Sequence, residues 1–382
     1  MNILIETFHS PHMNGRVGGA ETSLRLIAEE FAKKGHKVIF FSKSNTKTWF
    51  GCKKMHVNNV RVIVLTKFKL GFLNFYKFKK ISKILKNYYV LHYLKHTHVV
   101  HTYNNIGIVK YYAKLKSRYH FKLVVRMAGL KLFEDFETKP NLIHTYEKYF
   151  KAIDLYNFIS EGLKELVLKK TLEYNLKVNF EPYFVHDIGV DLGKLTDKSI
   201  QLKKQNTPFR IVMASRLSIY QKRQDILIET MSLLKNENIV LNIIGDGLKK
   251  SFLHEMAKEL KVEDKIIFEP FKRNIWNYLK DFDLLVHACD YEGLSKIIIE
   301  SMAVGLPVMS SDVLPMKNYI SNNENGFLCE NNPQIWASKI LYTYRNQELL
   351  EKVSSASKAF AKQKYDSSKN IDTYLLQFNA LN

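Results

Sequence analysis

The chain has 382 residues, 46% of them hydrophobic, and carries a formal net charge of +21 at pH 7. This length suits two domains of ordinary size, and the hydrophobic content is enough to pack both. The sequence has no apolar run of membrane-spanning length, and its three cysteines are widely spaced, which argues against a transmembrane segment, a disulfide framework and a zinc site. Glu6 also interrupts the first hydrophobic stretch, so we expect a soluble cytosolic protein without a signal peptide.

The first elements form a strand, a glycine loop and a helix. Asn2 to Thr7 is a predicted buried strand, and the apolar periodicity of a helix runs from Thr22 to Ala32. The loop between them, Gly15 to Ala20, gives the backbone room to approach a ligand. It lacks the Gly-x-Gly-x-x-Gly pattern, so a dinucleotide is not specifically indicated; a simple tight turn is the alternative explanation of its glycines.

The next hundred residues are strongly basic. Residues 31 to 133 contain 23 Lys and Arg and no Asp or Glu, whereas the rest of the chain is close to neutral. Strands are expected at Val38 to Ser42 and at Val60 to Leu65 within this stretch. Such asymmetry predicts a polyanionic partner for the first domain alone, which could be a membrane surface, an anionic glycan or a nucleic acid.

Phe75 to Leu91 is predicted to be an amphipathic helix. Its apolar side carries Phe78, Ile81, Leu85, Tyr88 and Tyr89, and its basic side carries Lys79, Lys80, Lys83 and Lys86. It could be a surface helix packed on the core, or an interfacial helix with aromatic rings among lipid headgroups. We favour membrane docking of this domain, because a few basic residues suffice near an anionic leaflet, without assigning the docking to this helix.

Regular alternation of strands and helices continues to the end of the chain. The further predicted strands are His98 to Tyr103, Leu123 to Arg126, Asp154 to Ser160, Phe209 to Ala214, Ile239 to Ile244, Ile266 to Phe271 and Asp283 to Val286. A polar linker is expected at Thr196 to Thr207, and helical periodicity resumes at Pro333. This alternation predicts parallel, doubly wound sheets, whose ligands bind at the carboxyl ends of the strands.

The stretch from Asp283 to Ser310 has the most informative pattern, which is strand, loop, helix and strand. Glu292 lies in the loop, Ser295 is the expected N-cap, and Glu300 follows about a turn and a half inside the helix. A loop carboxylate, a helix N-terminus that can hold a phosphate and a second carboxylate suit a sugar joined to a diphosphate and a ribose. The alternative is an ordinary turn with two solvated glutamates.

This stretch resembles the Glu-x7-Glu signature of glycosyltransferase family 4, the retaining transferases of GT-B fold. The matching residues are Glu292-Gly293-Leu294-Ser295, Glu300-Ser301-Met302-Ala303 and Gly305-Leu306-Pro307-Val308. The resemblance covers most of the chain and implies two Rossmann-like domains facing each other across a cleft. We expect residues 1–190, with the return of 366–382, to bind the acceptor and residues 191–365 to bind a nucleotide-sugar.

The resemblance also implies which residues act. Arg216 and Lys222 are expected to hold the donor diphosphate, with Arg223 as an alternative to Lys222, and Glu292 to face the sugar ring as a catalytic residue. The other expected donor-binding residues are Gly19, Gly293, Leu294, Ser295, Glu300 and the segment from Pro270 to Arg273. Fixed cations can stabilise a departing diphosphate without a metal, so neither a metal nor a cofactor is expected.

One position departs from the pattern. Many relatives place a histidine before the glycine of the loop after the Leu123 to Arg126 strand, and this chain has Ala128 there. His101, at the end of the preceding strand, could partly substitute, although a lone histidine on a strand is more often structural.

The expected reaction is transfer of a sugar, with retention of configuration, from a UDP-sugar or GDP-sugar to a glycan. The resemblance favours UDP, and a lipid-linked or lipopolysaccharide-type acceptor at the cytoplasmic face of a bacterial membrane. Another GT-B enzyme, such as a sugar-nucleotide epimerase or a phosphorylase, is an alternative. A nucleic-acid-binding protein is disfavoured, because no recognised nucleic-acid-binding module accompanies the charge. The sequence does not identify the sugar, the acceptor, the linkage or the oligomeric state.

Overall fold

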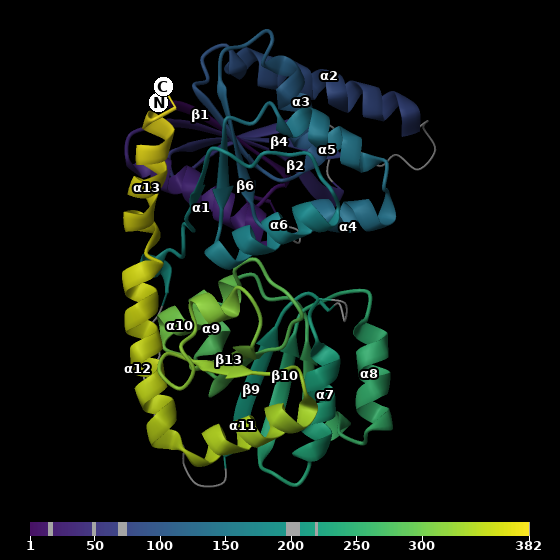
Figure 1. Cartoon of the computed structure of the whole chain (residues 1–382), viewed down its shortest axis with the longest axis vertical. Coiled ribbons are helices and arrows are strands. Elements are labelled where there is room, and N and C mark those ends of the chain that lie inside the picture. Colours follow the sequence, from purple (N-terminus) through teal and green to yellow (C-terminus); the bar gives the residue numbers. More distant parts are fainter. Residues whose placement is uncertain (14–17, 48–50, 68–74, 196–206, 218–220, 382) are drawn as a thin grey trace. The chain divides into compact units, whose positions relative to one another are not determined.

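The computed structural model divides the chain into two compact units (Figure 1). The first comprises Met1–Ile188 and Ser367–Asn382, and the second comprises Gly189–Asp366. The residues that the structure describes are 1–13, 18–47, 51–67, 75–195, 207–217 and 221–381. The linker predicted at Thr196 to Thr207 therefore lies almost wholly outside them, as do Gly15 to Val17 of the predicted glycine loop.

The first unit contains a sheet with the strand order β3-β4-β2-β1-β5-β6-β7-β8. Its strands are β1 (Asn2–His9), β2 (Lys37–Lys47), β3 (Gly51–Val57), β4 (Val60–Lys67), β5 (Val99–Tyr103), β6 (Lys122–Met127), β7 (Leu155–Phe158) and β8 (Tyr183–Val185). The pairs from β4 to β8 are parallel, and the register places Ile3 of β1 beside Val38 of β2 and Val99 of β5.

The edge strand β3 departs from the predicted parallel arrangement. It runs antiparallel to β4, with Val57 opposite Val60. The two residues between them, Asn58 and Asn59, have φ angles of 49° and 64°, which are the left-handed values of a two-residue hairpin turn. Asparagine tolerates these angles better than other residues with a side chain, so this turn reverses the chain where a crossover helix would otherwise be needed.

Helices cover both faces of this sheet (Figure 1). They are α1 (Gly19–Lys33), α2 (Phe75–Leu94), α3 (Ile106–Leu115), α4 (Lys131–Thr138), α5 (Leu142–Phe150), α6 (Glu161–Glu173) and α13 (Ser367–Asn379). Apolar residues of α1 and α13 pack with Ile3 and Ile5 of β1 in one core. Tyr112 of α3 reaches Glu6, whose side chain points to the opposite face because successive strand residues alternate.

The final helix, α13, is fixed to the first unit by a buried polar network. Arg126 of β6 is 1% exposed, forms an ion pair with Asp187 and donates to the hydroxyl of Tyr374 on α13. Arg126 also donates to Asn157 of β7, at 2.7 Å. Because a buried guanidinium requires several partners, this network specifies where α13 docks.

The amphipathic helix predicted at 75–91 is α2, but its described side chains do not divide as predicted. Lys86, assigned to the solvated basic side, forms an ion pair with the buried Glu6 and lies over the ring of Tyr111 at 4.0 Å. Tyr88, assigned to the packed side, is 67% exposed, and Ile84 is 58% exposed. The need of Glu6 for a cation inside the unit explains why a lysine faces inward.

The second unit contains a parallel sheet with the strand order β11-β10-β9-β12-β13-β14. Its strands are β9 (Phe209–Ala214), β10 (Ile239–Ile244), β11 (Ile266–Glu269), β12 (Leu284–His287), β13 (Val308–Ser311) and β14 (Phe327–Cys329). Its helices are α7 (Gln224–Leu233), α8 (Lys250–Glu259), α9 (Trp276–Leu279), α10 (Lys296–Val304), α11 (Pro333–Arg345) and α12 (Gln347–Lys364).

Alternate residues of β9, β12 and β13 pack in two separate cores of this unit. Met213 of β9 packs in the core under α7, α8 and α11, whereas its neighbour Val212 packs in the core under α9 and α10. Both faces of these central strands are therefore buried, which explains why they are largely apolar. The predicted doubly wound architecture is confirmed, and it directs the carboxyl ends of β9, β10 and β12 to one edge of the sheet.

Candidate functional site

The site begins where β12 ends. The chain leaves the sheet at His287, passes through the loop that holds Glu292, and enters α10 after Ser295. The helix ends at Gly305, whose φ of 89° is the left-handed conformation that favours glycine at a helix end. The predicted order of strand, loop, helix and strand is confirmed, and it places Glu292 at the carboxyl edge of the sheet.

Lys222 is brought to this loop by the backbone. It lies opposite Cys289 in an antiparallel bridge between the segment before α7 and the segment after β12. The amide of Arg223 donates to the carbonyl of Ala288 at 3.1 Å, and the amide of Asp290 donates to the carbonyl of Gln221 at 3.0 Å. These two bonds fix the position of Lys222 before its side chain makes any contact.

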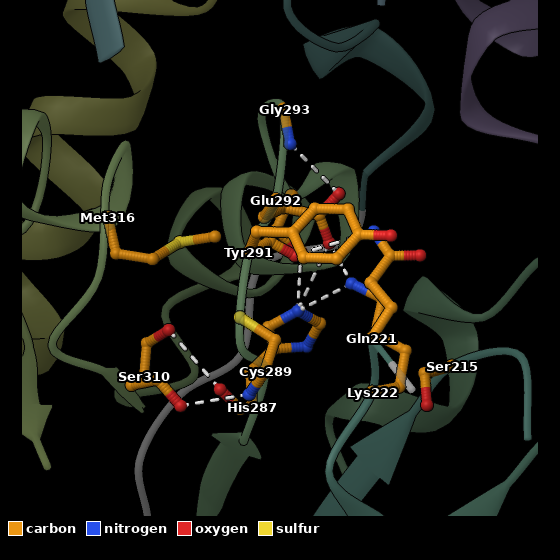
Figure 2. Close-up of polar contacts among 12 residues, drawn as sticks. Ser215, Gln221, Lys222, His287, Cys289, Tyr291, Glu292, Gly293, Ser310 and Met316 are labelled. Atoms are coloured by element: carbon orange, nitrogen blue, oxygen red, sulfur yellow. Dashed lines mark hydrogen bonds and ion pairs between the residues drawn. The ribbon is translucent and has the colours of Figure 1, made fainter. Parts of the chain in front are cut away.

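Lys222 and Glu292 form an ion pair at the centre of the site (Figure 2). The Lys222 side chain is 10% exposed and the Glu292 side chain 17%, so the pair is largely shielded from water but open on one side. The other carboxylate oxygen of Glu292 accepts from the amide of Gly293 at 3.2 Å. The structure thus brings together three of the predicted site residues.

The charge of Lys222 is sensitive to its surroundings. Burial lowers the pKa of Lys222 from its usual value to about 8; Cys289 acts in the opposite direction, and Arg216 lowers the pKa further. Direct contact with the Glu292 carboxylate favours the ammonium form. Lys222 is therefore a shielded cation at neutral pH, which suits binding to a phosphate oxygen.

His287 joins the same cluster, and the sequence had not suggested a role for it. Its Nε2 atom lies 3.1 Å from Nζ of Lys222, 3.2 Å from Oγ of Ser295 and 3.4 Å from the Glu292 carboxylate (Figure 2). Burial and the Lys222 charge lower the pKa of His287 well below its usual value. The imidazole is therefore neutral at physiological pH.

Ser295 holds the predicted N-cap position, and its hydroxyl makes a contact that the sequence did not predict. Its backbone is extended, as that of an N-cap residue should be, yet within the described residues its hydroxyl caps no amide of α10. The hydroxyl instead contacts Nε2 of His287. The predicted N-cap position is therefore confirmed, and within the described residues no amide of the first turn donates to this hydroxyl, which contacts the buried imidazole instead.

Arg216 lies at the edge of the cluster, in the loop after β9. It is exposed, and its guanidinium donates to the side chain of Gln221 at 3.3 Å.

The neighbouring β10–α8 turn packs closely against this loop: a Cβ on Gly247 would lie 2.1 Å from the carbonyl oxygen of Leu217. Gly245 approaches the Ser215 carbonyl equally closely and has a φ of 156°. The two glycines therefore serve packing between turns.

The remaining predicted donor residues lie in or next to α10, after β11, and in the first unit. Burial raises the pKa of Glu300, and Lys296, one turn earlier, lowers it. Leu294 packs against the core beneath the helix. Gly19 begins α1 in the first unit, where it is exposed and a Cβ would meet no atom within 4 Å. Pro270 to Arg273 follow β11 at the carboxyl edge of the second sheet.

His101 has a structural position. It is fully buried on β5, and its ring lies 5.4 Å from that of Phe378 on α13. Burial, and to a lesser degree Arg126, lower the pKa of His101 to about 3. It is therefore a neutral core residue under α13, and substitution for the histidine missing at Ala128 does not fit this position.

Comparison with known sequences places the site in a recognised domain. The family described as Glycosyl transferases group 1 matches residues 196–360. The poly(ribitol-phosphate) alpha-N-acetylglucosaminyltransferase of Staphylococcus aureus is 31% identical over 163 residues, which are 42% of this chain and 33% of that protein. The match thus spans about a third of that relative. The alpha-monoglucosyldiacylglycerol synthase of Streptococcus pneumoniae is 23% identical over 82% of this chain and 72% of its own length.

Comparison with solved structures extends the similarity to both units. The crystal structure of Anabaena HepE in complex with UDP and glucose has a TM-score of 0.75 to this chain, with 17% identity and coverage of 99% of each chain. At this identity the likeness concerns the fold, which is two α/β units with parallel sheets.

Proposed function

Because the chain belongs to the glycosyltransferases of GT-B fold, we propose that it transfers a sugar from a nucleotide-sugar, with UDP as the expected nucleotide, to a glycan acceptor. The observation that carries this proposal is the cluster of Lys222, Glu292 and His287 at the carboxyl edge of the second sheet, with Arg216 beside it. This is the edge at which ligands bind in open α/β sheets, and it offers a shielded cation.

Lys222 and Arg216 would stabilise the departing nucleoside diphosphate. Bond cleavage leaves negative charge on the diphosphate, and a cation held by the backbone before the reaction needs no reorganisation to meet it. Arg216 is exposed and can turn toward a ligand, whereas Lys222 is fixed by its backbone bridge. Among the described residues, no group of three or more His, Cys, Asp and Glu side chains is arranged as a metal site. We propose that these two cations serve the diphosphate.

The two glutamates would recognise the sugar and the ribose. Glu292 is 17% exposed and can accept from sugar hydroxyls or stabilise positive charge that develops at the anomeric carbon. Glu300 is buried, so a pair of ribose hydroxyls donating to it would satisfy its carboxylate. We propose a front-face reaction with retention, in which the leaving phosphate assists the incoming hydroxyl.

The first unit would present the acceptor. All four acidic residues that precede the basic stretch, Glu6, Glu21, Glu29 and Glu30, are buried, so they do not offset the exposed cations. Exposed Lys83, Ile84 and Tyr88 lie together on α2, which is a suitable composition for an anionic lipid interface. Among the described residues no helix is long and apolar enough to cross a bilayer. We propose a lipid-linked or cell-surface glycan acceptor, with this unit docked on the inner membrane face.

A donor screen tests the site. Thermal shift and nucleotide release should be measured with UDP-sugars and GDP-sugars for the wild type, Glu300→Ala and Arg216→Ala. The exposed residues Glu255 and Arg345 supply matched control variants, Glu255→Ala and Arg345→Ala. We expect UDP-sugar to stabilise the wild type and both controls, and the two site variants to lose this response. Full donor binding by both site variants would refute the assignment, and conversion of one UDP-sugar into another without UDP release would indicate an epimerase.

Sedimentation with vesicles tests the membrane surface. We expect the protein to bind vesicles that contain anionic lipid, to bind much less to zwitterionic vesicles, and to be released by salt, because exposed charges are screened within about 10 Å at 0.1 M ionic strength. Equal binding to both vesicle types, or none to either, would contradict membrane docking.

A further inference from the structure

His287 is a buried residue whose Nε2 atom faces the proposed donor site. It is 1% exposed at the last position of β12. The groups that face its Nε2 are Lys222 from the segment before α7, Glu292 from the loop and Ser295 from the start of α10. Lys222 and two residues of the distant β12–α10 connection therefore meet at one nitrogen atom.

The protonation state of His287 follows from these contacts. The shorter contact of Nε2 is to Lys222, at 3.1 Å against 3.4 Å to the Glu292 carboxylate. Because an ammonium can only donate, we assign Nε2 as the acceptor, which places the proton of the neutral ring on Nδ1. Nδ1 is buried and has no hydrogen-bond partner among the residues that the structure describes. A buried N–H without a partner destabilises the fold, and an apolar side chain of similar size would avoid that penalty. Core packing alone thus gives no reason for a histidine here.

We propose that His287 is a positioning residue for the donor diphosphate, holding the Lys222 ammonium in place and drawing the Ser295 hydroxyl away from the first turn of α10. This inference rests on the proposed function. The contact to Lys222 restrains a flexible side chain, so less conformational entropy is lost when a phosphate binds. The contact to Ser295 prevents that hydroxyl from occupying the helix N-terminus, where an anion would bind.

A pair of amide variants tests the contact with little change in chemistry. In His287→Gln the side-chain amide reaches about as far as Nε2, and in His287→Asn only about as far as Nδ1. Both carry an acceptor, so a difference between them reports the contact to Lys222 rather than the loss of a polar group. His254 on α8, whose ring stacks on Phe268 at 3.9 Å, provides the control variant His254→Leu.

The readouts are the dissociation constant for UDP by calorimetry and the steady-state kinetics with UDP-sugar. We expect His287→Gln to remain within about threefold of the wild type, and His287→Asn to bind UDP roughly tenfold more weakly, which corresponds to about 1.4 kcal/mol. His254→Leu should match the wild type. Equal UDP affinity for His287→Asn and the wild type would overturn the proposal, as would equal losses in the Asn and Gln variants.

The pH dependence of UDP binding separates positioning from a purely structural effect. The charged and titratable groups around Lys222 are His287, Glu292, Arg216 and Cys289. Loss of an acceptor disfavours the ammonium, so the pH above which UDP affinity falls should be lower in His287→Asn than in the wild type. An unchanged pH profile would contradict the inference. If the wild type binds neither UDP nor GDP, the proposed function itself fails; if it binds and His287→Asn binds equally well, only the role of His287 fails.

Discussion

Replacement of Lys222 by methionine removes the cation of the site and keeps the length of its side chain. Removal of one preorganised charge-stabilising group typically lowers kcat about 10²- to 10³-fold. Lys222 fits that class, because its backbone is fixed to the Cys289 segment by two hydrogen bonds and its side chain is 10% exposed. We therefore expect Lys222→Met to lower the rate of sugar transfer by roughly this factor.

The same change should destabilise the second unit by a smaller, separable amount. Removal of one partner of a buried ion pair costs about 3–5 kcal/mol. The Glu292 side chain is 17% exposed and can recover some hydration, so we expect about 2 kcal/mol. For a unit of this size that corresponds to a fall in melting temperature of about 4–8 °C. Adding Glu292→Gln removes the unpaired carboxylate and should restore most of the stability but none of the activity.

Both predictions are checked on the wild type, Lys222→Met and the double variant. Nucleotide release from UDP-sugar measures the activity, and differential scanning calorimetry measures the stability. Recovery of the melting temperature together with persistent loss of turnover is the expected pattern. The reasoning would be refuted if Lys222→Met kept wild-type turnover. It would also fail if the double variant regained activity, because the loss would then come from misfolding rather than from the missing cation.

Three further changes should have measurable effects. Donor affinity should fall as the pH rises above about 8, where Lys222 loses its proton. The pKa of Lys222 is lower in the folded state than in the unfolded state, so this proton loss does not destabilise the fold. The affinity measured by calorimetry and the melting temperature should therefore not fall together. Gly247→Ala would place a Cβ 2.1 Å from the carbonyl oxygen of Leu217, and thermal scanning should show a loss of several degrees, whereas an unchanged scan would contradict the close packing of these turns. Tyr374→Phe removes a hydroxyl to which Arg126 donates, costing about 1–3 kcal/mol, and should lower the melting temperature of the first unit without changing UDP affinity.

The elements that the sequence predicted well are those in which one local pattern determines the structure. The strand from Ile239 to Ile244 is β10 with identical bounds, because a run that is apolar except for Asn242, and that lies between turn residues, suits a buried strand of a doubly wound sheet. Glu292 was placed by its order relative to a strand and a helix, and Lys222 by the family resemblance; parallel topology then brings the ends of neighbouring strands together. Such placement requires no knowledge of side-chain contacts.

The missed features depend on partners that are distant in the chain. Strand β3 is rich in lysine and shows little apolar alternation, although Asn58-Asn59 followed by Val60 was a hairpin signal that could have located it. No local sequence pattern indicated a role for His287, because its contact with Lys222 joins residues 65 positions apart. The Ser295 cap was predicted from local preference alone, and only the folded structure shows the imidazole that competes for its hydroxyl.

The first unit shows why the number of charged residues in a stretch of sequence differs from the charge at the protein surface. The basic stretch contains Lys86, Lys116 and Arg126, which the fold pairs with Glu6, Asp154 and Asp187, so these cations do not contribute to the field outside the unit. The same pairing removes Glu6 from the surface, and the other acidic residues before the stretch are also buried. Because basic and acidic side chains are both removed from the surface in this way, the surface around α2 keeps the excess of cations that the sequence indicated. A polyanionic partner would therefore meet exposed lysines beside exposed Ile84 and Tyr88, a combination that favours a lipid interface over a purely ionic polymer.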